Sequence, residues 1–222
     1  MEFNRDLYLQ RLIAGMGSPL IKVITGIRRS GKSYLLFKLF TRYLKNQGVS
    51  DNHIIKIAFD DLENINLREK VALYKHIKSR IIDSDMYYVL LDEIQYVPEF
   101  EEVLNSLLHI ENADTYVTGS NSRFLSSDII TEFRGRSDEI RVQPLSFREY
   151  YEGLGGDKNE RLDEYMRFGG LPIVALLHDA EKKISYLKEV GEKIYLSDLK
   201  QRHSIKNDVD FIALSFVSNR QD

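Results

Sequence analysis

Short apolar runs alternate with amphipathic segments through about residue 145 of the chain. Apolar runs of this kind, bounded by polar turns, predict buried strands. The expected strands cover residues 20–25, 54–59, 87–91, 115–118 and 139–142. The third of these runs is almost continuously apolar, which is typical of a central parallel strand covered on both faces.

The segments between these runs repeat their apolar residues at helical spacing. Helices are therefore expected over residues 5–16, from the turn after the first strand to Gly48, over 67–81, and from Pro98 to Leu108. Strands that alternate with helices predict an α/β fold, in which a parallel sheet carries helices on both faces.

Beyond residue 145 the pattern indicates helices alone. Ser146 is placed to cap the first of them, and further helices are expected at about 159–168 and 179–200. The change of pattern divides the chain into an α/β core, residues 1–145, and a helical lid or appendage, residues 146–222.

Composition sets broad limits on the class of protein. A chain of 222 residues with 43% hydrophobic residues can form one large domain, or one domain with a small appendage. The 31 Lys and Arg residues against 34 Asp and Glu leave a net charge of −3. This charge gives no global signature of nucleic-acid binding, although a local basic patch stays open.

Cysteine and histidine usage narrows the chemistry. The chain has no cysteine, which excludes disulfides, thiolate metal sites and a thiol nucleophile. The five scattered histidines include no i,i+4 pair, which argues against a metal site built from histidines. The first residues lack signal-peptide character, and no apolar stretch approaches the length of a membrane span. We therefore expect a soluble, cytoplasmic protein without a membrane partner.

The turn after the first strand fits G-x-x-x-x-G-K-[ST] at every fixed position. Its residues are Gly26, Ile27, Arg28, Arg29, Ser30, Gly31, Lys32 and Ser33. The two glycines let successive backbone N–H groups point at one anion, and the following helix directs its positive end at the same place. In this pattern the lysine reaches the β- and γ-phosphates, and the serine hydroxyl holds magnesium. The alternative is a chance glycine-rich turn, but the flanking strand and helix favour nucleotide binding.

Two carboxylates, Asp92 and Glu93, directly follow the apolar run at 87–91. In open α/β sheets, ligands lie at the carboxyl ends of the strands. An Asp at this position is the usual second holder of magnesium, and the adjacent Glu can act as the general base that activates water. The alternative is a plain polar strand end. A small-molecule kinase would not need the glutamate, so the pair favours hydrolysis.

Two weaker signals lie further along the chain. Ser120 and Asn121 follow the strand at 115–118, where Asn121, with Ser120 beside it, could sense the γ-phosphate or the attacking water; a capped turn explains them equally well. Arg134 and Arg136 lie before the last strand, and an arginine there can neutralise charge in phosphoryl transfer, from the same or a neighbouring subunit. We prefer Arg136, against the alternative of a solvated surface arginine.

The order of these motifs resembles the AAA-type predicted ATPases of bacteria and archaea, whose C-terminal half is a domain of unknown function. The resemblance is carried by the loop at Gly26–Ser33, Leu90–Gln95, Thr118–Ser122, Gly135–Ser137, Pro144–Tyr150 and Phe168–Pro172. It implies a phosphate-loop core with sheet order 5-1-4-3-2 and a helical lid. It also implies ATP and magnesium as ligands, with Lys32, Ser33, Asp92 and Glu93 in the roles given above, Asn121 or Ser120 as sensor, and Arg136 at the family's arginine position. It assigns no chemical role to Phe168–Pro172.

Members of this family usually continue for about another domain's length. This chain stops inside an expected helix, whose apolar stripe of Val209, Ile212, Ala213 and Phe216 calls for a partner. We therefore expect a shortened protein, in which a part that selects a target is missing.

Three functions remain open. The first is an ATP-hydrolysing conformational switch acting on a DNA or protein partner, with a homo-oligomer if Arg136 acts on a neighbouring subunit. The second is a nucleotide-dependent binding module with little or no turnover, and the third is a small-molecule kinase. ATP is the default nucleotide because the guanine-reading Asn-Lys-x-Asp pattern is absent. Asp60, Asp61 and Glu63 could line the same sheet edge, but we interpret them as a solvated turn.

Overall fold

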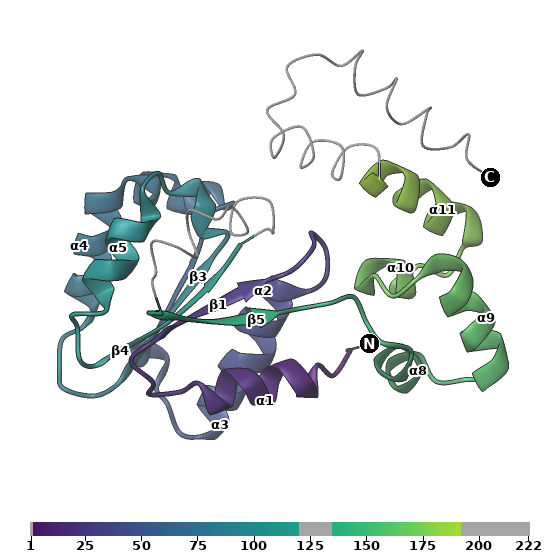
Figure 1. Cartoon of the computed structure of the whole chain (residues 1–222), viewed down its shortest axis with the longest axis horizontal. Helices are drawn as coiled ribbons and strands as arrows, with labels where there is room; N and C mark the ends of the chain where they lie inside the picture. Colours follow the sequence, from purple (N-terminus) through teal and green to yellow (C-terminus); the bar gives the residue numbers. More distant parts are fainter. Residues whose placement is uncertain (1, 120–134, 192–222) are drawn as a thin grey trace, which may run out of the picture.

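The computed structural model describes residues 2–119 and 135–191. Within these ranges, five strands form one sheet (Figure 1). The strands are β1 Ile21–Thr25, β2 Ile54–Ala58, β3 Tyr87–Asp92, β4 Ala113–Thr118 and β5 Ser137–Arg141. Every neighbouring pair is parallel, and the order is β2-β3-β4-β1-β5. This order confirms the α/β class and the 5-1-4-3-2 arrangement that the resemblance implied.

Helices precede the sheet and connect its strands. They are α1 Asp6–Ala14, α2 Lys32–Tyr34, η1 Leu35–Phe40, α3 Thr41–Asn46, η2 Asp51–His53, η3 Leu62–Arg68, α4 Lys70–Arg80, η4 Ile94–Tyr96 and α5 Phe100–Leu107. The segments α2, η1 and α3 follow one another without a break, and η1 is a π-helical stretch. π-helical turns inside longer helices are frequent at functional sites, and this one begins at Leu35, two residues after the end of the glycine-rich loop.

Helices cover both faces of the sheet (Figure 1). On one face Val89 and Leu91 pack with apolar residues of α4 and α5, and on the other Leu90 packs with those of α1, η1 and α3. Successive residues of a strand point to opposite faces, so burial on both sides explains why this strand is apolar without alternation.

Several boundaries differ from the expected ones. The helix expected over 67–81 starts at Lys70, because Glu69 caps it by accepting the N–H groups of Val71 and Ala72, and Leu67 lies in the preceding 3-10 turn. Within this helix Leu73 and Ile77 are buried, whereas Val71 is exposed. Helix α5 starts at Phe100, two residues beyond Pro98.

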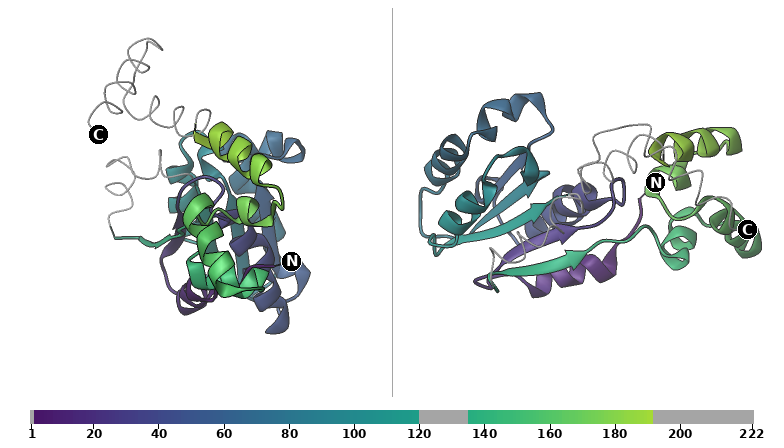
Figure 2. Two further views of the ribbon diagram at one scale, coloured as in Figure 1. Left: turned by 90° about the vertical axis from the view of Figure 1, so that its right-hand side faces the viewer. Right: turned by 45° about the horizontal axis from the view of Figure 1, so that its top comes forward.

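The helices after the sheet are α8 Phe147–Leu154, α9 Lys158–Phe168, α10 Pro172–Leu176 and α11 Ala180–Glu189. They lie together beside one end of the sheet (Figures 1 and 2). Ser146 caps α8 as expected, through a reciprocal capping box with Glu149. The expected extension of the last helix to residue 200 and the apolar stripe at 209–216 lie outside the described residues.

Backbone and side-chain contacts attach these helices to the end of β5. The N–H of Leu145 donates to the carbonyl oxygen of Gly170 at 2.7 Å, and the Tyr165 hydroxyl donates to the carbonyl oxygen of Leu145 at 2.9 Å. Phe3 packs in the same apolar cluster as Leu145 and Tyr150. Among the described residues, no helix combines the length and the apolar character needed to cross a bilayer.

Candidate nucleotide site

The parallel sheet brings three sequence-distant segments to one edge. The glycine-rich loop follows β1, Asp92 ends β3 and Thr118 ends β4. Strand β4 lies between β1 and β3 and pairs with both. The carboxyl ends of these strands therefore meet, and the loop, the aspartate and the threonine become neighbours.

The loop at 26–33 has the backbone of an anion cradle. Gly26 and Gly31 have φ values of 143° and 94°, and Arg29 has a φ of 68°. A Cβ at Gly26 would lie 2.2 Å from the carbonyl oxygen of Val142, so no other residue fits there. Ser30 is fully buried, and its hydroxyl oxygen has no hydrogen-bond partner among the described residues. Such an unmet buried polar group is what a bound phosphate would satisfy, so the loop fits a nucleotide.

Lys32 is the buried cation of this loop. Its ammonium group donates to the carbonyl oxygens of Gly26 and Ile27 at 3.0 and 3.1 Å. The side chain is therefore folded over the loop rather than extended into solvent. The helical segment that begins at Lys32 adds its positive N-terminal end to the same place.

Ser33 and Asp92, the two expected magnesium holders, are in contact. The Asp92 carboxylate accepts a hydrogen bond from the Thr118 hydroxyl, and the Ser33 hydroxyl lies close enough to lower the pKa of that carboxyl. Burial raises the pKa of the Asp92 carboxyl above its usual value, and the charges of Glu93 and Asp60 add to the rise, while the two hydroxyl donors oppose it. A hydroxyl and a carboxylate side by side form the oxygen ligand set that suits Mg²⁺.

Glu93 is held in an unusual backbone conformation. Its φ of 55° and ψ of 47° are left-handed, and its N–H donates to the Thr118 hydroxyl oxygen at 3.0 Å. The Gln95 side-chain amide donates to the Glu93 carboxylate. Left-handed conformations of residues other than glycine are sparsely populated and cluster at functional sites. The sequence had drawn attention to Glu93, but not to the positioning groups Thr118 and Gln95.

A signal for Thr118 was present in the sequence. It is the last residue of a strand expected to lie beside the one that ends in Asp92, so a hydroxyl there meets the carboxylate across the sheet. The turn formed by Asp60, Asp61 and Glu63 is exposed, and Asp61 caps the following 3-10 helix. Asp60 lies near enough to affect the pKa of Asp92.

Arg136 lies away from this site within the same chain. Its backbone carbonyl accepts the N–H of Ile21 at 3.0 Å, and its guanidinium donates to the side-chain oxygen of Asn105 on α5 at 3.3 Å. Ile21 pairs with Ser137 and Thr25 with Arg141, so Arg136 sits at the amino edge of the sheet, roughly 13 Å of strand from the loop. Ser120, Asn121 and Arg134 lie outside the described residues.

The helices that follow the sheet also contact the glycine-rich loop at 26–33. Pro172, at the start of α10, places its Cγ 3.7 Å from where a Cβ of Gly31 would lie. Ile27 packs against an apolar cluster of the helices, which consists of Phe168, Leu171, Val174 and Val190. The Arg29 guanidinium carbon lies 5.9 Å from the ring centre of Tyr186 on α11. The segment Phe168–Pro172, to which the sequence assigned no role, therefore rests against the loop.

A parallel sheet of this order, with the G-x-x-x-x-G-K-S loop after β1 and the Asp-Glu pair after β3, defines a phosphate-loop NTPase core of the AAA type. The chain belongs to the AAA domain family, whose model matches residues 18–151. This membership confirms the resemblance noted in the sequence, and it supports nucleotide binding.

Known relatives extend the comparison without assigning a function. The chain is 34% identical over 210 residues to an uncharacterised protein of Haemophilus influenzae, covering 92% of this chain and 52% of that one. It is 32% identical over 221 residues to one of Methanocaldococcus jannaschii, covering 92% and 46%. The chain thus spans about half the length of these relatives. Among solved structures, a Walker-type ATPase of Pyrococcus abyssi matches with a TM-score of 0.53 at 17% identity, over 99% of this chain and 77% of that one, which shows the shared fold.

Proposed function

We propose that this protein binds ATP with magnesium at the Gly26–Ser33 loop and hydrolyses it to ADP and phosphate. The observation that carries the proposal is that the Ser33 hydroxyl lies beside the buried Asp92 carboxylate, close enough to lower its pKa. This arrangement brings together the two groups of the motif that would hold magnesium. A chance glycine-rich turn would have no reason to meet a buried carboxylate from another strand.

Each residue of the site has a role in this proposal. Lys32 and the loop N–H groups bind the phosphates, and Ser33 and Asp92 hold the magnesium. Magnesium bound there would neutralise charge on the phosphate oxygens. Glu93 orients and deprotonates the attacking water as a general base, and Thr118 and Gln95 fix the backbone and the carboxylate of Glu93.

The helical region acts, in our proposal, as a lid that responds to the nucleotide. In this proposal residues 1–145 are the ATPase core, and residues 146–222 are the helical lid or appendage. The contacts of Pro172 with Gly31 and of Ile27 with the Phe168 cluster support this coupling. A loop that changes its contacts when phosphate binds would shift α10 and α11 against the core, as γ-phosphate switches do elsewhere.

Completion of the site by another subunit is a further part of the proposal. Arg136 is separated from the loop of its own chain by the length of β5, so it would serve the site of a neighbouring copy in a homo-oligomer. We keep Asn121, with Ser120 beside it, as the proposed γ-phosphate sensor. The target of the switch would be a DNA or protein partner. We expect that the target is selected by a region that corresponds to the additional length of the relatives.

A nucleotide-dependent binding module with little turnover is the second candidate. The position of Arg136 favours it for an isolated chain, because a site without its arginine loses a group that contributes about 10³–10⁵-fold to turnover in related phosphoryl-transfer enzymes. The two candidates share one binding site and differ only in rate.

Phosphate release from the purified protein with magnesium and ATP tests the proposal. The Glu93→Gln variant should bind ATP and lose turnover by about 10²–10⁴-fold, the usual contribution of a general base. The Lys32→Ala variant should bind ATP about 10–100-fold more weakly, because hydrogen bonds to charged groups contribute about 1.5–3 kcal/mol.

The possible outcomes distinguish the hydrolase from the binding module, and they also show whether the loop binds nucleotide at all. Turnover that disappears in Glu93→Gln establishes a hydrolase. ATP binding without turnover at any protein concentration supports the binding module. ATP binding that is unchanged in Lys32→Ala would remove the loop from the site altogether.

A further inference from the structure

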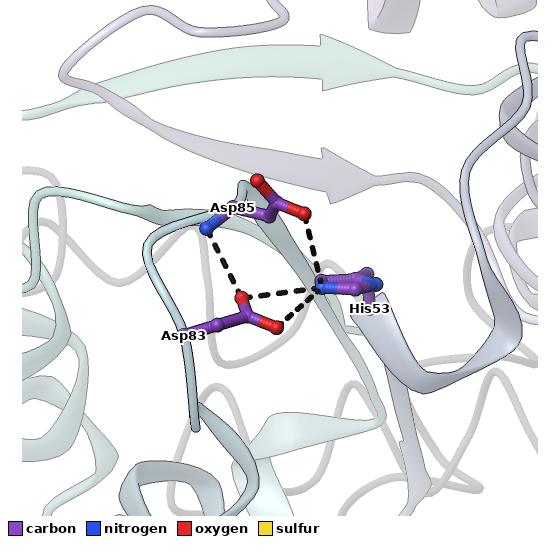
Figure 3. A group of neighbouring side chains, drawn as sticks. All are labelled: His53, Asp83 and Asp85. Atoms are coloured by element: carbon purple, nitrogen blue, oxygen red, sulfur yellow. Dashed lines mark hydrogen bonds and ion pairs between the residues drawn. The ribbon is translucent and has the colours of Figure 1, made fainter.

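A second group of metal-ligating side chains lies at the amino edge of the sheet, opposite the nucleotide site. His53 immediately precedes β2, while Asp83 and Asp85 precede β3 (Figure 3). Because β2 and β3 are parallel neighbours, with Ile54 paired to Tyr88, their amino ends bring the histidine and the aspartates together. Nothing in the proposed ATPase uses these residues.

The ligand atoms lie at distances that one metal ion can bridge. His53 Nε2 is 3.3 and 3.2 Å from the two carboxylate oxygens of Asp83, and 3.8 Å from a carboxylate oxygen of Asp85. One ligand atom from each residue lies within 4.8 Å of the other two. A tetrahedral zinc ion with bonds of about 2.0–2.2 Å holds its ligand atoms roughly 3.3–3.5 Å apart. Only small side-chain movements would therefore be needed.

The scaffold around the three side chains is fixed by contacts that do not involve them as ligands. The Asn112 side-chain amide donates to the backbone carbonyls of Asp83 and Asp85, at 2.9 and 3.0 Å. The His53 ring packs against the Tyr87 ring, with centroids 4.6 Å apart. The three ligands thus start from positions held by neighbouring strands, which lowers the entropy lost on binding an ion.

Burial and charge also suit a cation. The His53 side chain is 18% exposed, whereas those of Asp83 and Asp85 are 45% and 80% exposed. The imidazole is thus the least exposed of the three groups, and both carboxylates are within reach of solvent. Figure 3 shows both carboxylates directed towards the same ring nitrogen of His53. Among the ion pairs that the structure describes, those of the two aspartates are with His53 alone. With a neutral imidazole, the cluster carries two negative charges for one divalent ion.

We propose that His53, Asp83 and Asp85 form a zinc site, separate from the magnesium of the nucleotide site. An imidazole nitrogen with two carboxylates favours a borderline ion such as Zn²⁺ over Mg²⁺, which prefers oxygen ligands and retains its water. Three protein ligands leave one position of a tetrahedral ion for water. The ion would connect the segment before β2 to the segment before β3, and so brace this edge of the sheet.

Calorimetric titration of the full chain with Zn²⁺, without nucleotide, tests the site. We expect one bound equivalent and a higher unfolding temperature in its presence. His53→Gln should weaken this binding by about tenfold or more, since even the groups that merely orient metal ligands contribute about 10–100-fold. Asp85→Asn should weaken it as well, and this exposed position leaves the fold intact.

Two matched variants show whether the zinc is bound at this cluster or elsewhere on the protein. His109→Gln removes an exposed histidine outside the cluster, and Asp92→Asn removes a carboxylate of the nucleotide site; both should retain zinc binding. If wild type shows no saturable binding, or if His53→Gln binds as wild type does, the cluster is only a histidine–aspartate ion pair and the proposal is overturned. Zinc binding that is lost in Asp92→Asn would likewise assign the ion to the nucleotide site. Neither result would affect the proposed ATPase.

Discussion

The Ser33 hydroxyl lies beside the Asp92 carboxylate, close enough to lower its pKa, across the end of β4, the strand that separates β1 from β3. Asp92 is only 3% exposed and has no cationic partner among the ion pairs that the structure describes. The protein therefore keeps an acid in a place where burial disfavours its charge. This cost to the unliganded fold is expected where a group is retained for a ligand.

The first prediction follows from that burial. Asp92→Asn keeps the shape and an oxygen acceptor for Thr118, but removes the buried charge. We expect the free energy of unfolding without nucleotide to rise by about 0.5–2 kcal/mol, while the magnesium dependence of nucleotide binding is lost. Urea unfolding of the unliganded protein measures the first effect, and nucleotide titration with and without magnesium measures the second.

Asp114 supplies the matched control for this prediction. It is as buried as Asp92, but it forms an ion pair with the fully buried Lys22. Asp114→Asn leaves that lysine without its charge partner, and breaking a buried pair costs about 3–5 kcal/mol. The two substitutions should change stability in opposite directions. A loss of stability in both would show that Asp92 is a structural residue.

The second prediction concerns Thr118, whose hydroxyl donates to Asp92 and accepts the N–H of Glu93. Thr118→Val has nearly the same volume and removes both hydrogen bonds. We expect the ATP turnover rate to fall by about tenfold or more, because small displacements of a general base are costly, while ATP affinity changes little. Thr118→Ser keeps the hydroxyl and should retain the rate. A variant that loses affinity and rate equally would argue against a role in positioning Glu93.

Local patterns in the sequence were sufficient to predict the strands of the sheet and to locate the candidate nucleotide site. The apolar runs predicted the strands, and the glycine-rich loop identified Gly26–Ser33 because its chemistry is carried by consecutive residues. Asp92 could be assigned because a parallel sheet gathers the ends of its strands at one edge. The sheet order confirms that reasoning for β1, β3 and β4.

Local patterns could not predict features that depend on how the strands pair or on contacts between segments far apart in the sequence. The edge on which Arg136 lies is set by the pairing of Ile21 with Ser137, which the sequence does not encode locally. The approach of Pro172 to Gly31 likewise depends on contacts between distant segments, such as the hydrogen bond from the Leu145 N–H to the Gly170 carbonyl oxygen. Histidine spacing argued against a metal site built from histidines, yet β2 and β3 place His53 beside two aspartates from another segment.

The third prediction tests the attachment of the helical lid. A Cβ at Gly170 would lie 2.1 Å from the backbone carbonyl oxygen of Leu145, so Gly170→Ala must separate the two segments. Overpacking of this kind costs about 1–3 kcal/mol, and the displaced α10 should also weaken ATP binding. Thermal unfolding and nucleotide titration measure the two effects. Gly191→Ala meets no atom within 4 Å and should behave as wild type; equal behaviour of both variants would contradict the proposed attachment.

The fourth prediction concerns a buried charge inside the helical region. Lys183 is 2% exposed and is ion-paired with Glu164, which also pairs with Arg161. Glu164→Gln leaves the lysine charge buried without a counter-charge. Breaking a fully buried pair costs about 3–5 kcal/mol, and because Glu164 is 23% exposed, we expect a smaller loss of about 2 kcal/mol. Urea unfolding at neutral pH measures it.

The pH dependence of this loss distinguishes a charge effect from a packing effect. Burial alone would raise the pKa of Glu164, but hydrogen bonds from Lys183 and Arg161, with a smaller influence of the nearby Tyr150 hydroxyl, outweigh it and lower the pKa below its ordinary 4.5. A carboxyl whose pKa is lowered by folding stabilises the protein above its unfolded pKa, and this contribution is lost as pH falls through the folded value. The difference between wild type and Glu164→Gln should therefore be full at pH 7 and shrink below about pH 4.5. Glu152→Gln, which breaks the exposed pair with Arg148, should show no such difference at either pH; a Glu164→Gln effect that persists unchanged in acid would instead indicate lost packing.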